Sequence, residues 1–243
     1  MIALPASGAL VLWWFFRSVR AKEASGREPL LSLRLFDNGA SSLGLVTQNL
    51  QWLLLLGTSF TVAAYLQVVR GYDAVQTGVV FTAATLGLLA TSLSAERLAR
   101  RHPQRTLIMT GFAFSLAGVV VLITLVGSFA SVWAFVPGLL LIGLGLGVML
   151  TPSVNVVQSS FPEEQQGEIS GLSRSVSNLG SSFGTTIAGT ILVAGLTKGA
   201  YAAAMIVLAV IGLGGLAAAA LRPRETGPRN THACRSTART PRT

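Results

Sequence analysis

Two stretches of 21 residues, 75–95 and 106–126, contain no charged side chain, and only a short basic segment separates them. At a rise of about 1.5 Å per residue, each stretch would form a helix of about 31 Å, which matches the hydrocarbon thickness of a bilayer. A soluble domain does not place two such helices around a basic segment. The sequence therefore predicts two membrane-spanning helices joined by a short connection.

The same pattern continues along most of the chain. Charged residues make up 11% of the sequence and hydrophobic residues 51%, whereas about 25% of a soluble domain is charged. The apolar segments are apolar on nearly all sides, as expected where lipid or another helix covers each face. The predicted fold is an all-α integral membrane protein in which a six-helix bundle, 43–221, follows a partial helix. Its seven hydrophobic segments lie at about 2–16, 43–66, 75–95, 106–126, 132–157, 170–193 and 200–221.

Positive charges gather on one side of the predicted membrane. If connections alternate between the two faces, one face receives five Lys and Arg residues in 17–42, four in 96–105 and six in 222–243, whereas the other receives two. This imbalance follows the positive-inside rule, so we expect a multi-pass protein of the cell membrane with a cytoplasmic C-terminus. Because the charges are spread over separate connections, they do not indicate a nucleic-acid-binding surface. The arginines expected to fix the topology as a cytoplasmic loop are Arg97, Arg100, Arg101 and Arg105.

The two ends of the chain differ from the bundle. The apolar segment 2–16 allows only about 22 Å of helix, and basic residues follow it, whereas in a secretory signal peptide they precede the apolar part. We predict a partial transmembrane helix whose beginning is absent, so that the chain is a fragment; a tilted or interfacial first helix is the alternative. Residues 17–42 are expected to form a cytoplasmic linker, and 222–243 a disordered basic tail that anchors the topology or binds anionic lipid.

The predicted spans lack the residues that membrane enzymes need. The centres of the six complete spans contain no Asp, Glu, Lys or His, and both histidines, His102 and His232, lie outside them. The sequence shows no serine–histidine arrangement, paired carboxylates or cluster spaced for a metal ion. Its single cysteine, Cys234, excludes an internal disulfide framework. We therefore expect no enzyme activity, no catalytic residue, no metal and no cofactor.

Uncharged polar residues enter the membrane in two segments. Amides that face lipid are costly, so the glutamine-bearing face of 43–66 should meet protein or water. It is either the wall of a substrate cavity or a set of interhelical hydrogen bonds. The polar stripe of 170–193 also suits a cavity, although we expect its Arg174 to reach lipid headgroups or an acidic loop. The candidate cavity residues are Gln48, Gln51 and Thr58 in the first segment and Asn178, Ser181 and Thr185 in the second.

Small residues at helical spacing indicate close helix packing in two of the spans. Glycine lets two backbones approach, and proline removes a backbone hydrogen bond and kinks a helix. The alternating glycines of 143–147 lie inside a span and lack a following lysine, so they do not form a phosphate-binding loop. The residues predicted to pack or bend helices are Gly143, Gly145, Gly147, Pro152, Gly180 and Gly184.

Several local patterns resemble the carboxy-terminal half of a major facilitator superfamily transporter, and in particular the fourteen-span drug:proton antiporters. In the order found in that family, they are REPLLSLRLF at 27–36, YLQVVRGYDAVQTG at 65–78, LARRHPQR at 98–105, and the glycine-rich segments at 143–157 and 169–192. Two departures stand out. Asp73 and Ala74 replace the usual Ser-Pro, and Arg100 and Pro103 replace the acid and the glycine of the loop motif.

The resemblance implies a parent protein that exports small molecules against proton influx, with substrate bound between two six-helix bundles near the middle of the membrane. Its partners would be the lipid bilayer, the substrate, protons and an N-terminal bundle that this chain lacks. The family's membrane-embedded carboxylate also has no counterpart here, so we expect no transport by this chain alone. The alternatives are a half-size protein that acts as a dimer, a facilitator permease for another substrate class, and a non-functional truncated remnant.

Overall fold

The computed structural model describes residues 39–128, 131–158, 165–195 and 197–221, together with Leu10, Trp13, Trp14 and Arg17. Apart from these four residues and the start of the bundle, the predicted partial helix 1–16 and linker 17–42 lie outside the described residues. The predicted tail 222–243 lies outside them too.

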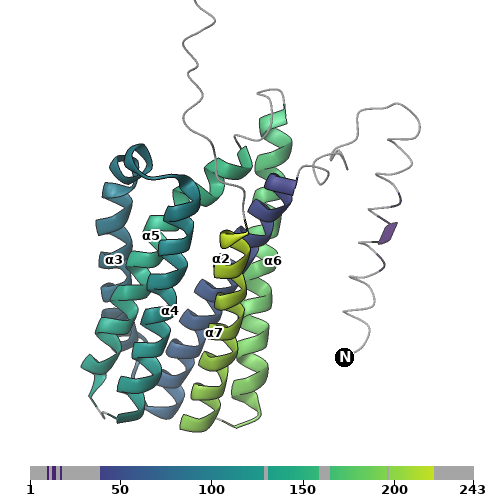
Figure 1. Cartoon of the computed structure of the whole chain (residues 1–243). Coiled ribbons are helices and arrows are strands. Elements are labelled where there is room, and N and C mark those ends of the chain that lie inside the picture. Colours follow the sequence, from purple (N-terminus) through teal and green to yellow (C-terminus); the bar gives the residue numbers. More distant parts are fainter. Residues whose placement is uncertain are drawn as a thin grey trace, which may run out of the picture.

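Six long helices make up most of the described residues, and no strand occurs among them (Figure 1). This confirms the predicted all-α fold. The helices are α2 (Gly39–Ala64), α3 (Ala74–Arg101), α4 (Gln104–Ser128), α5 (Val136–Gln158), α6 (Gln166–Val193) and α7 (Lys198–Ala220). Helix α2 continues into the π-helical turn η2 (Tyr65–Val69), and the 3-10 turn η3 (Val132–Phe135) precedes α5.

Five of these helices are long and apolar enough to cross a membrane. Within the described part of the chain, the five candidate spans are Ser42–Val69, Ala74–Ser94, Gln104–Leu125, Val132–Gln158 and Lys198–Ala220. The remaining long helix, α6, has 28 residues but is less apolar, because Ser, Thr and Gly make up much of it. A helix of this kind needs protein or water along its polar side.

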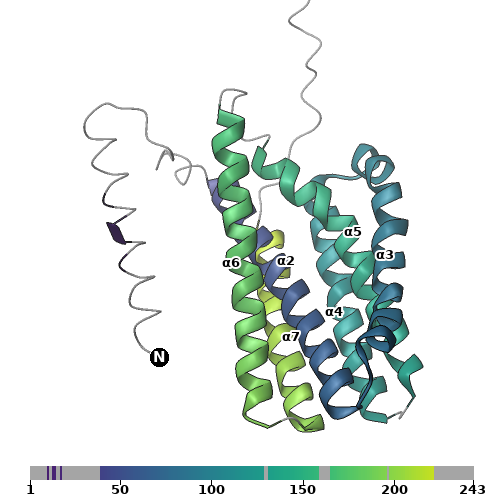
Figure 2. The ribbon, with the colours of Figure 1, turned by 180° about the vertical axis from the view of Figure 1, so that it is seen from behind.

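The helices are arranged as two interlocked groups of three. Helix α5 packs between α3 and α4, whereas α2 packs between α6 and α7. The two groups meet where α2 contacts α5 and where α4 contacts α7. Figures 1 and 2 show α3 and α6 at opposite edges of the bundle. In chain order the bundle has two halves, α2 to α4 and α5 to α7. The first helix of each half, α2 or α5, thus lies between the second and third helices of the other half.

Glycines bring α5 into direct contact with the backbone of α3. A Cβ atom added to Gly143 would overlap the carbonyl oxygen of Ala84, and one added to Gly147 would lie 2.7 Å from the carbonyl oxygen of Leu88. Both pairs are four residues apart, so one glycine face of α5 follows one row of carbonyl groups on α3. Such contacts supply close van der Waals packing and Cα–H···O interactions, which hold helices together in lipid.

Helices α2 and α6 make the same kind of contact, with the glycines on α6 and the carbonyl groups on α2. Added Cβ atoms at Gly180 and Gly184 would overlap the carbonyl oxygens of Asn49 and Leu53 on α2. These positions are again four residues apart on each helix. The two interlocked groups are therefore each assembled around a glycine-to-carbonyl seam.

The connection between η2 and α3 is a tight turn. Gly71 has a φ of +71°, which L side chains rarely adopt. Asp73 then caps α3: the Gln76 backbone N–H donates to Asp73 Oδ1 at 2.7 Å, and the Asp73 N–H donates to Gln76 Oε1 at 3.2 Å. The side chain of Asp73, which departs from the family pattern, thus forms a capping box with the side chain of Gln76, and this box fixes the start of α3.

The predicted arginine loop is shorter than expected. Helix α3 continues to Arg101 and α4 begins at Gln104, so only His102 and Pro103 lie between them. Leu98 accepts the last helical bond from the His102 N–H at 2.9 Å. The segment is rich in Arg, Leu and Ala, which favour helix, and Pro103 forces the chain to turn. Hydropathy locates the end of the apolar part but not the end of the helix.

Arg105 connects the start of α4 to the end of α7. Its guanidinium donates a hydrogen bond to the carbonyl oxygen of Ala220, the last residue of α7. The side chain is half-buried, and its Nε has no partner among the described residues. A cation at this position also interacts favourably with the negative end of the helix dipole. Arg97 and Arg101, by contrast, are exposed, and the side chain of Arg100 lies outside the described residues.

Replacing Arg105 with glutamine is expected to loosen the end of α7. The change removes a charged hydrogen bond and a favourable dipole interaction, together worth about 1–2 kcal/mol. Hydrogen exchange in lipid nanodiscs should show faster exchange of the last-turn amides of α7, with little change in α5. Arg97→Gln is the matched control, since that side chain is exposed. Equal effects of both substitutions would contradict a specific contact between Arg105 and α7.

Candidate functional site

The first glutamine of α2 lies in the contact with α6. Gln48 is buried, and its Nε2 donates hydrogen bonds to the Oγ atoms of Ser173 at 2.7 Å and Ser177 at 2.9 Å. Ser173 Oγ in turn donates to Gln48 Oε1 at 3.0 Å. Beside it, Asn49 Nδ2 donates to the Val176 carbonyl oxygen at 2.9 Å. These bonds join two helices through side chains on both.

Two further polar side chains of α2 are buried, and each has an oxygen atom without a hydrogen-bond partner among the described residues. Gln51 is 2% exposed and Thr58 1% exposed, and the unpaired atoms are Gln51 Oε1 and Thr58 Oγ1. An unpaired buried polar atom costs on the order of 1–3 kcal/mol. Thr58 differs from Gln51 in its surroundings, because it lines a pocket and Gln51 does not.

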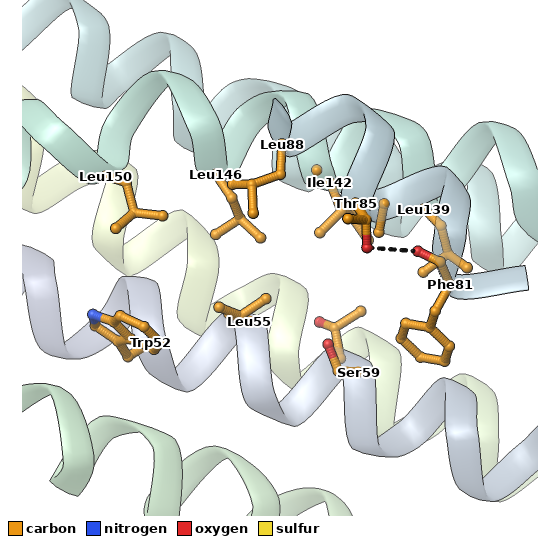
Figure 3. Close-up of a pocket in the computed structure, with 13 residues that line it drawn as sticks. Trp52, Leu55, Ser59, Phe81, Thr85, Leu88, Leu139, Ile142, Leu146 and Leu150 are labelled. Atoms are coloured by element: carbon orange, nitrogen blue, oxygen red, sulfur yellow. Dashed lines mark hydrogen bonds between the residues drawn. The ribbon is translucent and has the colours of Figure 1, made fainter. Parts of the chain in front are cut away.

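This pocket lies between α2, α3 and α5 and has a volume of about 270 Å³. Figure 3 shows Trp52 and Leu150 at one end and Phe81 and Leu139 at the other. Aliphatic side chains form the walls between the two ends, and the hydroxyl-bearing residues Ser59 and Thr85 lie toward Phe81. The lining residues are Trp52, Leu55, Thr58, Ser59, Phe81, Ala84, Thr85, Leu88, Leu139, Ile142, Gly143, Leu146 and Leu150.

The pocket lies near the middle of the predicted membrane. Leu55 is at the centre of the span Ser42–Val69, and Leu146 is one residue from the centre of Val132–Gln158. The backbone contact between α3 and α5 forms one side of the pocket, since both Ala84 and Gly143 line it. Close packing of these two helices therefore determines the shape of that wall.

The candidate residues of α6 do not line this pocket. Asn178 is exposed, whereas Ser181 and Thr185 are half-buried. The hydroxyl of Ser181 donates to the Ser177 carbonyl oxygen at 3.0 Å, and that of Thr185 donates to the Ser181 carbonyl oxygen at 3.1 Å. Both hydroxyl groups are thus satisfied within α6. The structure brings Thr58 alone among the six candidates to the pocket, and the cavity role of the others stays a prediction.

The helix-packing candidates lie in three contacts. Gly143 and Gly147 face α3, and Gly180 and Gly184 face α2, as described above. Gly145 faces α4, where an added Cβ would lie 2.5 Å from the Gly111 carbonyl oxygen and from Ser115 Oγ. Pro152 is buried inside α5. Whether these residues control bending of the helices in transport stays a prediction.

Most of the residues that line the pocket are not among those predicted from the sequence. Leu55 lies on the predicted polar face of α2 with Gln48, Gln51 and Thr58, whereas Trp52 and Ser59 each lie one residue beside that face. A wider face that included the residue after Gln51 would have identified Trp52. The contributions of α3 and α5 give no such signal, because both helices are apolar on nearly every side.

The lining can bind a molecule but offers no chemistry for bond cleavage. Of the 13 described residues around the pocket, none has an ionisable side chain. Within the described residues, no group of three or more His, Cys, Asp or Glu side chains is placed to hold a metal ion. Aromatic and aliphatic walls with a few hydroxyls are typical of small-molecule binding sites.

Comparison with known proteins identifies one family model and several relatives that match this chain. Residues 1–185 match the family model of the Major Facilitator Superfamily. The chain is 28% identical over 187 residues to the tetracycline resistance determinant of Streptomyces rimosus, which covers 76% of this chain and 53% of that protein. It is 30% identical over 181 residues to the tetracenomycin C resistance and export protein of Streptomyces glaucescens, with coverage of 73% and 33%.

A third relative is a multidrug efflux pump of Mycolicibacterium smegmatis, 28% identical over 166 residues, with coverage of 68% of this chain and 33% of the pump. The chain therefore spans about one third to one half of the length of these relatives.

Proposed function

Because this chain belongs to the major facilitator superfamily, whose members are membrane transporters, we propose that it is the carboxy-terminal part of a proton-coupled efflux transporter for small molecules. The relatives named for drug resistance, export or efflux support the direction of transport. Their greater length supports the view that a second bundle completes the transporter.

The observation that carries the proposal is the pocket near the middle of the predicted spans. Transporters of this kind bind substrate near the bilayer midplane, between two bundles that expose it alternately to each side. This pocket is bounded by three helices of one bundle. In the proposed transporter, an N-terminal bundle covers its open side, and the substrate touches both bundles.

We assign proton coupling to the proposed N-terminal bundle. In the described residues, the acidic positions associated with the bundle are Asp73, Glu96 and Glu168, at the start of α3, near its end and in the first turn of α6. A carboxylate that exchanges a proton with substrate transport must lie close to the substrate. Since these three lie at helix ends, the coupling carboxylate of the proposed transporter comes from the N-terminal bundle.

The proposed orientation follows the charges. Arg97, Arg101 and Arg105 lie at the end of the bundle where α3 passes to α4, and the end of α7 lies beside Arg105. With these residues in the cytoplasm, the protein is a multi-pass protein of the cell membrane, and residues 17–42 and 222–243 are cytoplasmic.

A hybrid transporter tests the proposed function. In it, this chain replaces the matched region of the Streptomyces glaucescens relative, and intracellular tetracenomycin C is measured in a host that lacks its own exporters. The hybrid should lower drug accumulation to the level of the unmodified relative, and a protonophore should abolish the difference. Cells with the 243-residue chain alone should accumulate as much drug as cells with empty vector.

Two results would contradict the proposal. A hybrid that reaches the membrane in normal amounts but does not export would show that this bundle does not act in efflux. Protonophore-sensitive export by the chain alone would show that it needs no N-terminal bundle, and would support the alternative of a half-size protein that acts as a dimer.

A further inference from the structure

We infer that the pocket between α2, α3 and α5, as this bundle forms it, selects uncharged, elongated aromatic molecules that carry an oxygen acceptor, in preference to organic cations. The inference rests on the proposed function and names its substrate class. It follows from three features of the pocket: its shape, its lack of charge, and the position of its hydroxyl groups.

The shape favours a long and rigid ligand. Trp52 and Phe81 lie at opposite ends of the pocket, and Leu55, Leu88 and Leu146 lie between them (Figure 3). Trp52 and Ser59 are seven residues apart on α2, which corresponds to about 10 Å along the helix. An aromatic ligand of this length contacts a ring at either end and aliphatic walls along its faces. A rigid ligand also loses little conformational entropy on binding.

The lack of charge disfavours cations. No lining residue is ionisable, and the two described acids at the ends of α3 are each eight residues from the nearest lining residue on that helix, about 12 Å along it: Asp73 precedes Phe81, and Glu96 follows Leu88. In this bundle by itself, a cation in the pocket would lose its hydration without gaining a counter-charge from the lining residues. Contact with the face of Trp52 or Phe81 replaces only part of that hydration. An uncharged ligand does not meet this penalty.

The hydroxyl groups favour a ligand that carries an oxygen acceptor. Thr58 lines the pocket, is 1% exposed, and its Oγ1 has no partner among the described residues. Its O–H can therefore donate to a ligand. Thr85 is already engaged, because its Oγ1 donates to the Phe81 carbonyl oxygen at 3.3 Å. In a helix threonine divides between two rotamers, so a carbonyl or hydroxyl oxygen of a ligand can recruit the Thr58 hydroxyl.

Binding of a matched pair of tricyclic probes tests the inference. Acridone is planar, uncharged and carries a carbonyl oxygen, whereas 9-aminoacridine has a similar ring system and is a cation at neutral pH. The full 243-residue chain is reconstituted in nanodiscs of zwitterionic lipid, and each probe is equilibrated by dialysis against protein-free nanodiscs. Acridone should bind at least about tenfold more tightly than 9-aminoacridine.

Two substitutions assign the binding to this pocket. Trp52→Leu should weaken acridone binding about tenfold, whereas Trp133→Leu should leave it unchanged, because Trp133 is 72% exposed and lines a different pocket. Thr58→Val should weaken it about threefold to tenfold. Thr61→Val is the matched control on the same helix, since the Thr61 hydroxyl donates to the Gly57 carbonyl oxygen and does not line the pocket.

The outcomes separate this inference from the proposed function. Binding of 9-aminoacridine that is as tight as that of acridone and depends on Trp52 would overturn the substrate class while leaving the pocket as a transport site. Acridone binding that is absent, or indifferent to both Trp52 and Thr58, would overturn the inference itself. The hybrid export assay still decides the proposed function in either case.

Discussion

Gly143→Ala is expected to separate α3 from α5 and to lower the free energy of unfolding by about 2 kcal/mol. An added Cβ would overlap the carbonyl oxygen of Ala84, which belongs to a helix backbone and cannot rotate away. Overpacking of this kind costs about 1–3 kcal/mol, and a backbone obstacle puts it at the upper end. The greater helix preference of alanine offsets only about 0.5–1 kcal/mol of that cost. Unfolding by sodium dodecyl sulfate in mixed micelles, followed by circular dichroism, measures the change.

Gly171→Ala is the matched control, and it should have the opposite sign. Gly171 is an exposed residue of α6, and nothing lies within 4 Å of a Cβ added there. The substitution should therefore stabilise the protein by about 0.5–1 kcal/mol. If Gly143→Ala were also neutral or stabilising, the close approach of α3 and α5 would be wrong.

The membrane fold could be predicted because the bilayer sets the length of an apolar segment. The predicted segment 106–126 lies within α4, and 75–95 lies within α3. The continuation of α3 to Arg101 could not be predicted in the same way, because polar residues beyond the membrane keep a helix going without a hydropathy signal. The π-helical turn at Tyr65–Val69 likewise leaves no mark in the apolar pattern.

The packing order of the helices was beyond the reach of sequence reasoning. Helices such as α4 and α5 are apolar on nearly every side, so their sequences do not indicate which side meets which neighbour. Glycine gives the best local hint. Gly143 and Gly147, and likewise Gly180 and Gly184, are four residues apart, which predicts a close contact but does not identify the partner helix.

The candidate site was predictable only in part, because a shared helix face does not mean a shared environment. Gln48 and Thr58 lie on one broad side of α2, yet Gln48 meets α6 and Thr58 meets the pocket. A helix between several neighbours changes partner along its length. Residues from α3 and α5 enter the pocket through tertiary packing alone, which explains why Phe81 was not identified.

Gln48→Leu should lower the free energy of unfolding by about 1–2 kcal/mol. It removes hydrogen bonds to Ser173 and Ser177, and interhelical bonds in membranes are worth about 0.6 kcal/mol on average, up to about 1.7. It also leaves the Ser173 hydroxyl, which donates to Gln48 Oε1, without that acceptor. Adding Ser173→Ala to Gln48→Leu should cost little more, because the two side chains act as a pair. The detergent unfolding assay gives all the values needed for this double-mutant cycle.

The control for this substitution is Gln67→Leu, because Gln67 is exposed on η2 and should change stability by no more than about 0.5 kcal/mol. The same variants in the hybrid transporter address the two interpretations of Gln48. If it holds α2 to α6, export should fall only as the amount of folded protein falls. The opposite result would be unchanged stability together with loss of export by Gln48→Leu. The hydrogen-bonding interpretation would then be wrong, and Gln48 would belong to the wall of the substrate cavity. Its hydrogen bonds to Ser173 and Ser177 would form only in a closed state of the bundle.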